Sequence, residues 1–162
     1  MEKGVLLHSS VVFQRMFSSF VEAQDNVINL EESLWNHHII RQLVHFLYFA
    51  QIEAAFCNDI ANLFQLFCVA EYYAIGSLVT ECCHQFILTL SPETVCYLLL
   101  KLESDGPQFG HVEPIEFMRK HEILWQYAIN NIVRVKKVKY YQQMLYSAPQ
   151  ILNTLIDKMT RN

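Results

Sequence analysis

The chain has 162 residues, enough for one domain or for one domain with a small extension. Its composition is 52% hydrophobic and only 17% charged, which excludes an intrinsically disordered chain and indicates an ordered protein with apolar surface for a partner. The formal net charge of −4 gives no overall attraction toward nucleic acid or an anionic membrane, so neither is expected as a partner.

The cellular setting follows from what the chain lacks. No apolar run approaches the roughly 18 residues that a bilayer span needs. The start, Met1–Gly4, is not followed by the apolar core of a secretory signal. Five cysteines, an odd number, sit inside helical apolar patterns, which favours reduced, buried thiols. We therefore expect an intracellular protein, cytoplasmic or nuclear, without disulfides.

The first elements are a helix, a strand and a second helix. Val5–Phe17 places its apolar residues on one helical stripe, and Asn26–Leu30 is a short β-branched strand candidate. Ser33 is the expected N-cap of a helix that reaches about Leu47. Tyr48–Ala55 mixes aromatic and β-branched residues, which leaves it open between a helix end and a short strand, and a brief strand or an extended turn is favoured.

The middle of the chain predicts three more helices. Asn58-Asp59 caps the first, and Gly76 is expected to end it. Ser77–Leu90 is the second. Ser91-Pro92-Glu93 starts the third with a hydroxyl cap, a proline in the first turn and an acid near the positive end of the helix dipole, and this helix continues to Leu102.

The best internal boundary is the loop Ser104–Glu113, which contains two of the four glycines. Helices are predicted beyond it over Pro114–Val135, Tyr140–Ser147 and Pro149–Met159. The expected fold class is therefore α+β and predominantly α-helical, with one or two short strands.

A series of short apolar landmarks runs through residues 5–90 in a definite order. They are Ser10-x-x-Phe13, Met16-Phe17, Phe20-x-Glu22, Val27-Ile28-x-Leu30, Phe46-Leu47-Tyr48, Ala70-x-x-Tyr73 and Leu78-x-x-x-Cys82-x-x-Phe86-Ile87. In this order the chain resembles a BTB (POZ) domain, a protein-interaction module. The resemblance implies a BTB-like domain over residues 1–90. The helical extension over residues 91–162, with its boundary loop near 104–113, resembles the BACK segment that often follows BTB.

The resemblance also implies that the domain is shortened at its N-terminus. A BTB domain normally opens with a β-hairpin and a helix, and only Leu6-Leu7 here matches the end of that segment. Family dimers commonly use these N-terminal elements, so a homodimer is the weaker expectation. Shortened BTB chains of this texture are frequent in filamentous fungi, and the resemblance implies such a source.

Phe20 and Glu22 are the candidate partner-binding residues. In the family, a hydrophobic-x-Glu motif after the Ser-x-x-Phe helix helps to dock the cullin scaffold of a ubiquitin ligase, and Phe20-Val21-Glu22 matches it by position and type. An exposed phenylalanine can anchor in an apolar pocket while the carboxylate binds donors at its rim. The alternative interpretation is that Phe20 packs into its own core and Glu22 is an ordinary solvated acid.

Three other groupings favour structural interpretations. Cys82-Cys83-His84 lacks a second pair of metal ligands at zinc-site spacing, so core thiols beside a surface imidazole are expected instead of a metal site. His37-His38 and His45 have no acid placed to orient them as catalytic bases. The run from Arg134 to Lys139, followed by Tyr140-Tyr141, is either a small phosphate-binding patch or a solvated helix end, and the second is favoured.

The sequence therefore predicts a non-enzymatic interaction protein without a cofactor or metal. The leading hypothesis is a substrate adaptor that docks a cullin through Phe20 and Glu22 and contacts an unknown substrate elsewhere. Two alternatives stay open. One is a self-associating or transcription-associated BTB scaffold that never meets a cullin, and the other is a degenerate, truncated product.

Overall fold

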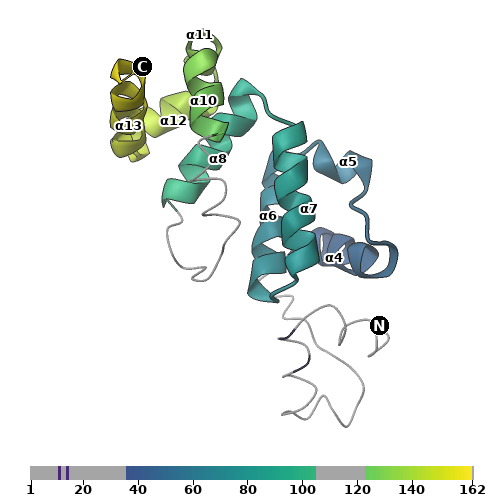
Figure 1. Ribbon diagram of the computed structural model, residues 1–162. Helices are drawn as coiled ribbons and strands as arrows, with labels where there is room; N and C mark the ends of the chain where they lie inside the picture. The colour runs from purple at the N-terminus through teal and green to yellow at the C-terminus, as the bar shows by residue number, and fades with distance from the viewer. Residues whose placement is uncertain (1–10, 12–13, 15–35, 105–122, 162) are drawn as a thin grey trace. The chain divides into compact units, whose positions relative to one another are not determined.

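The computed structural model of the chain describes residues 11, 14, 36–104 and 123–161 (Figure 1). Its helices are α4 (His37–Phe49), α5 (Ala54–Cys57), α6 (Ile60–Tyr72), α7 (Gly76–Leu88), α8 (Pro92–Ser104), α10 (Ile123–Asn130), α11 (Ile132–Val135), α12 (Lys139–Ser147) and α13 (Pro149–Thr160). Within these ranges there is no strand, so the predominantly helical prediction is confirmed. The predicted helix Val5–Phe17 and strand Asn26–Leu30 lie almost wholly outside the described residues.

Helix lengths bear on two questions. The longest helices of the described ranges have 13 residues, and none of them is long and apolar enough to cross a membrane. Isolated helices of this length are marginal in water. Packing of apolar faces must therefore hold them.

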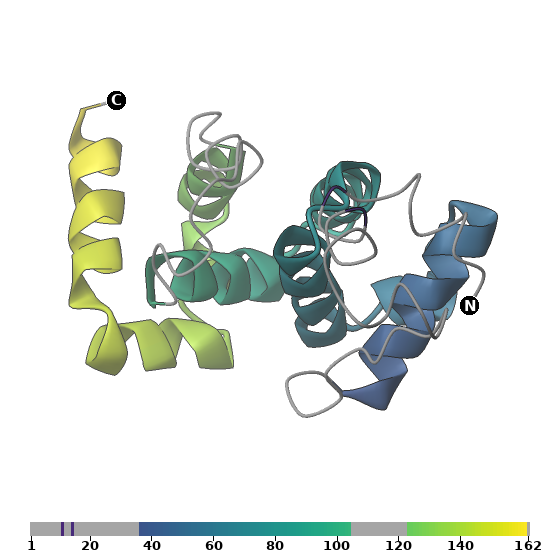
Figure 2. The same ribbon diagram turned by 90° about the horizontal axis from the view of Figure 1, so that it is seen from below.

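The chain divides into two compact units, residues 1–85 and 86–162. We call them unit 1 and unit 2. In unit 1, α4 and α5 both pack against α6, and the two ribbon views show α7 alongside α6 (Figures 1 and 2). Their facing sides are buried and almost entirely apolar, and the fully buried side chains include Ile39, Leu43, Leu63, Leu66, Phe67, Ile75 and Leu78.

Side-chain caps fix where two helices of unit 1 begin. Asn36 Oδ1 accepts the His38 N–H at 2.9 Å at the start of α4. Asp59 Oδ1 accepts the backbone N–H groups of Ala61 and Asn62 at 2.9 and 3.1 Å, which confirms the predicted cap of α6. Ser33, the predicted cap of α4, lies outside the described residues, and the observed cap is Asn36.

Tyr48–Ala55 forms no strand; it is a helix end followed by a short non-helical connection. Helix α4 continues through Phe49, and Ala50 ends it in the left-handed conformation at φ 54°. Only residues 50–53 are non-helical before α5 begins. The aromatic and β-branched residues here lack a partner strand among the described residues, so helix packing overrides their strand preference.

One buried polar side chain holds the α4–α5 connection. Gln42 on α4 is 1% exposed and is the buried polar residue of the described core. Oriented so that both amide atoms are satisfied, its Nε2 donates to Glu53 Oε2 at 2.9 Å and its Oε1 accepts the Glu53 N–H at 3.1 Å. Gln42 thus ties α4 to the residue that precedes α5.

The connection between α6 and α7 also differs from the prediction. Gly76 does not end α6; it is the first residue of α7. Helix α6 stops at Tyr72, and the left-handed residue after it is Ala74 at φ 52°. Nothing near Gly76 would meet an added Cβ, so the position does not require glycine for space.

In unit 2, α8 is the central helix. It contacts α10, α11, α12 and α13, and every residue from Val95 to Leu100 is buried. A helix that is apolar all round is one that neighbours enclose. The rings of Tyr97 on α8 and Tyr140 on α12 meet edge to face at 5.1 Å.

The start of α8 confirms the predicted cap. The Thr94 N–H donates to Ser91 Oγ at 3.1 Å, and the Ser91 N–H donates back to Thr94 Oγ1 at 2.7 Å. Such reciprocal capping satisfies two otherwise unpaired donors, with Pro92 supplying the pre-set φ of the first turn.

The long helix predicted over Pro114–Val135 is interrupted. Asn131 separates α10 from α11, and both its backbone N–H and its Nδ2 donate to the Tyr127 carbonyl at 3.0 Å. An asparagine side chain that bonds the backbone competes with the helix ladder, which explains the break. The two final helices agree with the predictions to within one residue at each end.

We expect the Gln42→Ala variant to lower the free energy of unfolding by about 1–3 kcal/mol, because the Glu53 groups lose their buried partner. Urea denaturation followed by circular dichroism measures this. The control is Gln65→Ala on the exposed side of α6, which should change the value by less than about 0.5 kcal/mol. Equal losses in both variants would show that the Gln42–Glu53 contact does not stabilise the fold.

Candidate interaction surfaces

The predicted docking residues, Phe20 and Glu22, lie within residues 15–35, outside the part of the chain that the structure describes. Their role stays a prediction. The described residues nevertheless contain several surfaces and clusters that bear on function.

Exposed aromatic side chains mark the ends of two helices in unit 1. Tyr48 and Phe49 close α4, and Phe49 is 65% exposed. Tyr72, the last residue of α6, is half exposed. The imidazole of His45 lies against the Phe49 ring with 4.8 Å between centroids, which holds one face of that ring. Large aromatic side chains left in water in this way are typical anchors for protein partners.

Four cysteines gather where α5, α6 and α7 meet. They are all buried, and they are Cys57, Cys68, Cys82 and Cys83. Burial raises the pKa of the Cys82 thiol well above its usual value, and the neighbouring thiols Cys83, Cys57 and Cys68 and the Glu81 carboxylate raise it further. Such thiols stay protonated and unreactive at neutral pH, so they act as small core residues.

Glu71 is the one carboxylate with a strongly shifted pKa in the described residues. Its side chain on α6 is half-buried, and burial raises its pKa to about 7. The facing thiol, Cys83 on α7, has its pKa raised to about 12 by burial and then by the Glu71 charge. Ionising Glu71 therefore costs stability at neutral pH.

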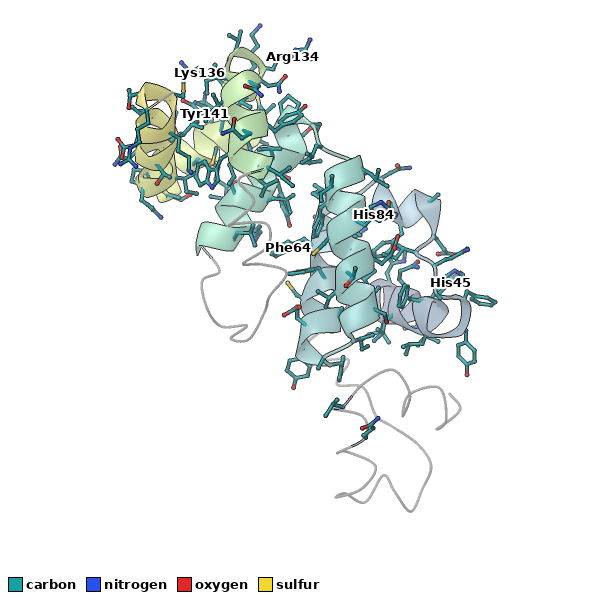
Figure 3. The ribbon with its side chains drawn as sticks, viewed as in Figure 1. His45, Phe64, His84, Arg134, Lys136 and Tyr141 are labelled. Atoms are coloured by element: carbon teal, nitrogen blue, oxygen red, sulfur yellow. The ribbon has the colours of Figure 1, made fainter. Side chains whose placement is uncertain are left out.

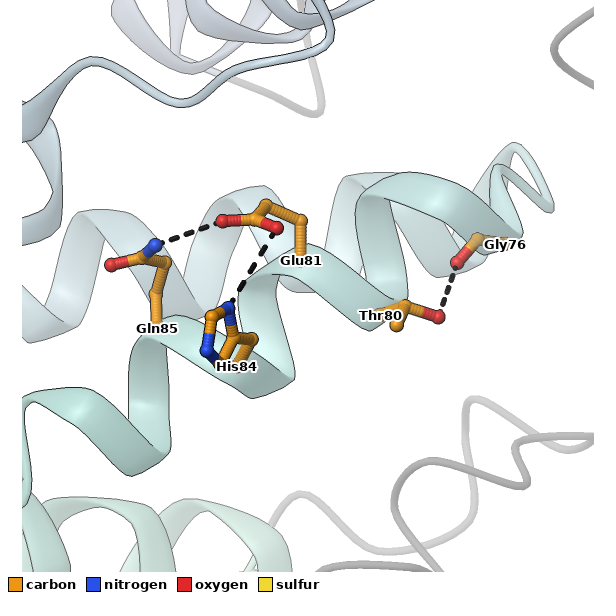
Figure 4. Close-up of polar contacts among 5 residues, drawn as sticks. All are labelled: Gly76, Thr80, Glu81, His84 and Gln85. Carbon is orange, nitrogen blue, oxygen red and sulfur yellow. Dashed lines mark hydrogen bonds and ion pairs between the residues drawn. The ribbon is translucent and has the colours of Figure 1, made fainter.

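The Cys82-Cys83-His84 grouping is divided between the core and the surface. Cys82 and Cys83 are buried, whereas the His84 side chain is 61% exposed. Its Nδ1 lies 4.0 Å from Glu81 Oε2, and Gln85 Nε2 donates to Glu81 Oε1 at 2.8 Å (Figure 4). Searched over the described residues, the chain holds no group of three or more His, Cys, Asp or Glu side chains placed to bind a metal.

The remaining histidines pack against aromatic rings. His38 on α4 lies 5.2 Å from Phe56 on α5, between ring centroids, and His45 contacts Phe49. These contacts support the structural interpretation of His37-His38 and His45, in which the rings cover apolar surface.

Four of the nine Lys and Arg residues of unit 2 lie close together along the chain. Arg134, Lys136, Lys137 and Lys139 are all exposed, on α11, at the start of α12 and in the turn between them. Figure 3 shows Arg134 and Lys136 at the α11 end of this unit. The neighbouring Tyr140 ring is engaged by Tyr97, so the basic residues and the aromatic residue beside them do not form one open patch.

The sequence did not single out several of these surface residues. The residue pattern favours a strand or turn for Tyr48 and Phe49, and Gln42 lies among the apolar residues of α4, where no pattern distinguishes it. The sequence pattern identifies the basic run, but not the acid-free stretch around it: residues 123–156 contain no Asp or Glu. A scan for acid-free stretches would have shown it.

Together these features define a helical protein whose exposed aromatic and charged side chains suit binding to another macromolecule. A protein-family model of the BTB/POZ domain matches residues 1–90, which is more than half of the chain. The chain belongs to the BTB/POZ domain family, and a BTB domain is a protein–protein interaction module. No curated protein matches the chain.

The domain division predicted at residue 90 stays a prediction, as does the BACK-like character of residues 91–162. The family match ends at residue 90, and the compact units divide between residues 85 and 86. The predicted boundary loop is almost wholly outside the described residues, since only Ser104 is described.

We expect stability to fall as the pH rises through the folded-state pKa of Glu71. The unfolded chain releases this proton near the ordinary glutamate pKa of 4.5, whereas burial raises the pKa in the folded chain to about 7. Below the lower value the folded state keeps its full contribution, and above the higher value that contribution is lost.

The Glu71→Gln variant should therefore be close to the wild type in unfolding free energy near pH 4 and exceed it near pH 8, as measured by urea denaturation at each pH. The exposed Glu93→Gln change on α8 is the matched control. If the difference between Glu71→Gln and wild type does not grow with pH, the buried carboxylate is not the source of the effect.

Proposed function

We propose that the chain is a non-enzymatic adaptor that docks a cullin scaffold through Phe20 and Glu22 of its BTB domain. The observation that carries the proposal is the BTB/POZ match over residues 1–90, together with the Phe-x-Glu motif that follows the Ser-x-x-Phe landmark. In this proposal Phe20 supplies the apolar anchor and Glu22 pairs with donors at the rim of its pocket.

The described part of unit 1 supports a role in binding. Its exposed aromatics, Tyr48, Phe49 and Tyr72, supply apolar area beyond what its own core uses. Interfaces are enriched in such rings. Its charge is also suited to a basic partner, because residues 1–85 contain nine acids and three Lys or Arg, a formal charge of −6. An intracellular setting, in the cytoplasm or nucleus, is part of the proposal.

A self-associating BTB scaffold is the second candidate. The same exposed aromatics favour it, because a second copy of the chain would cover them equally well. Light scattering separates the two candidates: a stable dimer that ignores cullin supports the scaffold, and a monomer that binds cullin supports the adaptor.

The test is isothermal titration calorimetry of the purified chain with a cullin scaffold. We expect wild type to bind and Phe20→Ala or Glu22→Ala to weaken binding by about 2 kcal/mol or more, as for interface hot spots. Ile156→Ala and Glu93→Ala, at an exposed apolar and an exposed acidic residue of unit 2, are control variants that should bind within about threefold of wild type.

Thermal unfolding of each variant separates docking from folding. A Phe20→Ala protein that melts like wild type but binds poorly supports docking, whereas a large loss of stability supports a core role for Phe20. Failure of the wild type to bind cullin in calorimetry and in pull-down would overturn the adaptor proposal.

A further inference from the structure

Charge is distributed unequally between the two units. Residues 1–85 carry a formal charge of −6, whereas residues 86–162 contain seven acids and nine Lys or Arg, a formal charge of +2. The positive charge of unit 2 is concentrated on one turn. We call this the basic turn, made of Arg134, Lys136, Lys137 and Lys139.

The basic turn has a fixed backbone. The N–H groups of Lys136, Lys137 and Val138 donate to the carbonyls of Ile132, Arg134 and Val135 at 3.0, 3.1 and 3.2 Å. Val135 is 1% exposed and anchors the turn in the core of unit 2. The four cations are therefore held on a rigid support, which lowers the entropy cost of binding through them.

These cations are not neutralised by described residues. None of the four forms an ion pair with a carboxylate of the described residues, and the nearest Asp or Glu along the chain are Glu122 and Asp157. Four like charges within six residues repel one another, and their energy falls when an anionic group approaches.

The surface beside the basic turn is rich in hydrogen-bond donors and apolar groups. Lys139, Gln142, Gln143 and Tyr146 recur at helical spacing, so they share one face of α12, and all are exposed. Tyr146 is 87% exposed, and Val133 on α11 is 68% exposed. Amides and cations donate to carboxylates and to peptide carbonyls, and the two apolar side chains suit apolar side chains of a peptide.

We propose that the basic turn and the exposed face of α12 bind an acidic, Asp/Glu-rich segment of a partner protein that also carries apolar side chains. This inference goes beyond the cullin-docking proposal and does not depend on it. Charge complementarity carries the inference: no described carboxylate pairs with these four cations, and an acidic segment would neutralise them.

The surface fits a protein segment better than a nucleic acid. Nucleic-acid sites combine phosphate-binding cations with open aromatic rings on which bases stack. Here the Tyr140 ring is occupied by Tyr97 and Tyr141 is only partly exposed, so Tyr146 is the one exposed aromatic ring among the described residues of unit 2, whereas successive bases stack on several rings. The overall charge of −4 also opposes a polyanion that spans more than this turn.

The test is fluorescence anisotropy with the full chain and a labelled peptide of alternating glutamate and leucine. A peptide with glutamine at every glutamate is the uncharged control. We expect the acidic peptide to bind, the glutamine peptide to bind at least about tenfold more weakly, and affinity to fall as salt is raised.

The variant is the double change Lys136→Glu/Lys137→Glu, at two exposed positions that should leave folding intact. It should weaken binding of the acidic peptide about tenfold or more. The matched control, Arg41→Glu/Arg161→Glu, alters net charge equally at exposed positions away from the basic turn and should bind within about threefold of wild type.

The inference would be overturned if wild type did not bind the acidic peptide, or if the two double variants lost peptide affinity equally. Tighter binding of a single-stranded DNA oligonucleotide than of the peptide would also overturn it. So would a Lys136→Glu/Lys137→Glu variant that loses self-association without any change in peptide affinity. The last result would assign the basic turn to the acidic half of a second copy.

Discussion

The described structure depends on the burial of short apolar helices. With at most 13 residues each, these helices would be marginal alone, so each persists because a neighbour covers its apolar face. In unit 2, α8 covers the apolar faces of the other helices: it is buried from Val95 to Leu100 and contacts four of them. In unit 1, α4 and α5 pack against α6, and the buried thiols of Cys82 and Cys83 on α7 are part of the core, where burial raises their pKa values.

Because the cores use most of the apolar residues, function is left to what remains on the surface. Unit 1 keeps exposed rings at the ends of α4 and α6, and its residues carry a formal charge of −6. Unit 2 keeps the basic turn, with no acid between residues 123 and 156. Because the two units carry charge of opposite sign, each suits a partner of the other sign. Such charge complementarity raises the association rate and the specificity more than the affinity itself.

Much of the helical structure was predictable, because it rests on periodicity and caps. Asp59 caps α6 through its carboxylate and Ser91 caps α8 through its hydroxyl, as the sequence predicts. The misses have local physical causes. Ala50 and Ala74 adopt left-handed conformations that alanine disfavours, so no residue marked those turns. The Asn131 side chain bonds the backbone inside a helical pattern, and the Gln42–Glu53 contact joins residues that no pattern pairs. The family was recognisable from ordered landmarks, whereas the acid-free setting of the basic turn needed a scan of charge along the chain.

The central claim is that one chain offers two independent binding surfaces, one in its BTB domain and one on the basic turn. Native mass spectrometry of the full chain with both a cullin scaffold and the glutamate–leucine peptide tests it most directly. The account predicts a complex that contains all three molecules, in which neither ligand displaces the other. A chain that binds only one ligand at a time, or that binds neither, contradicts it.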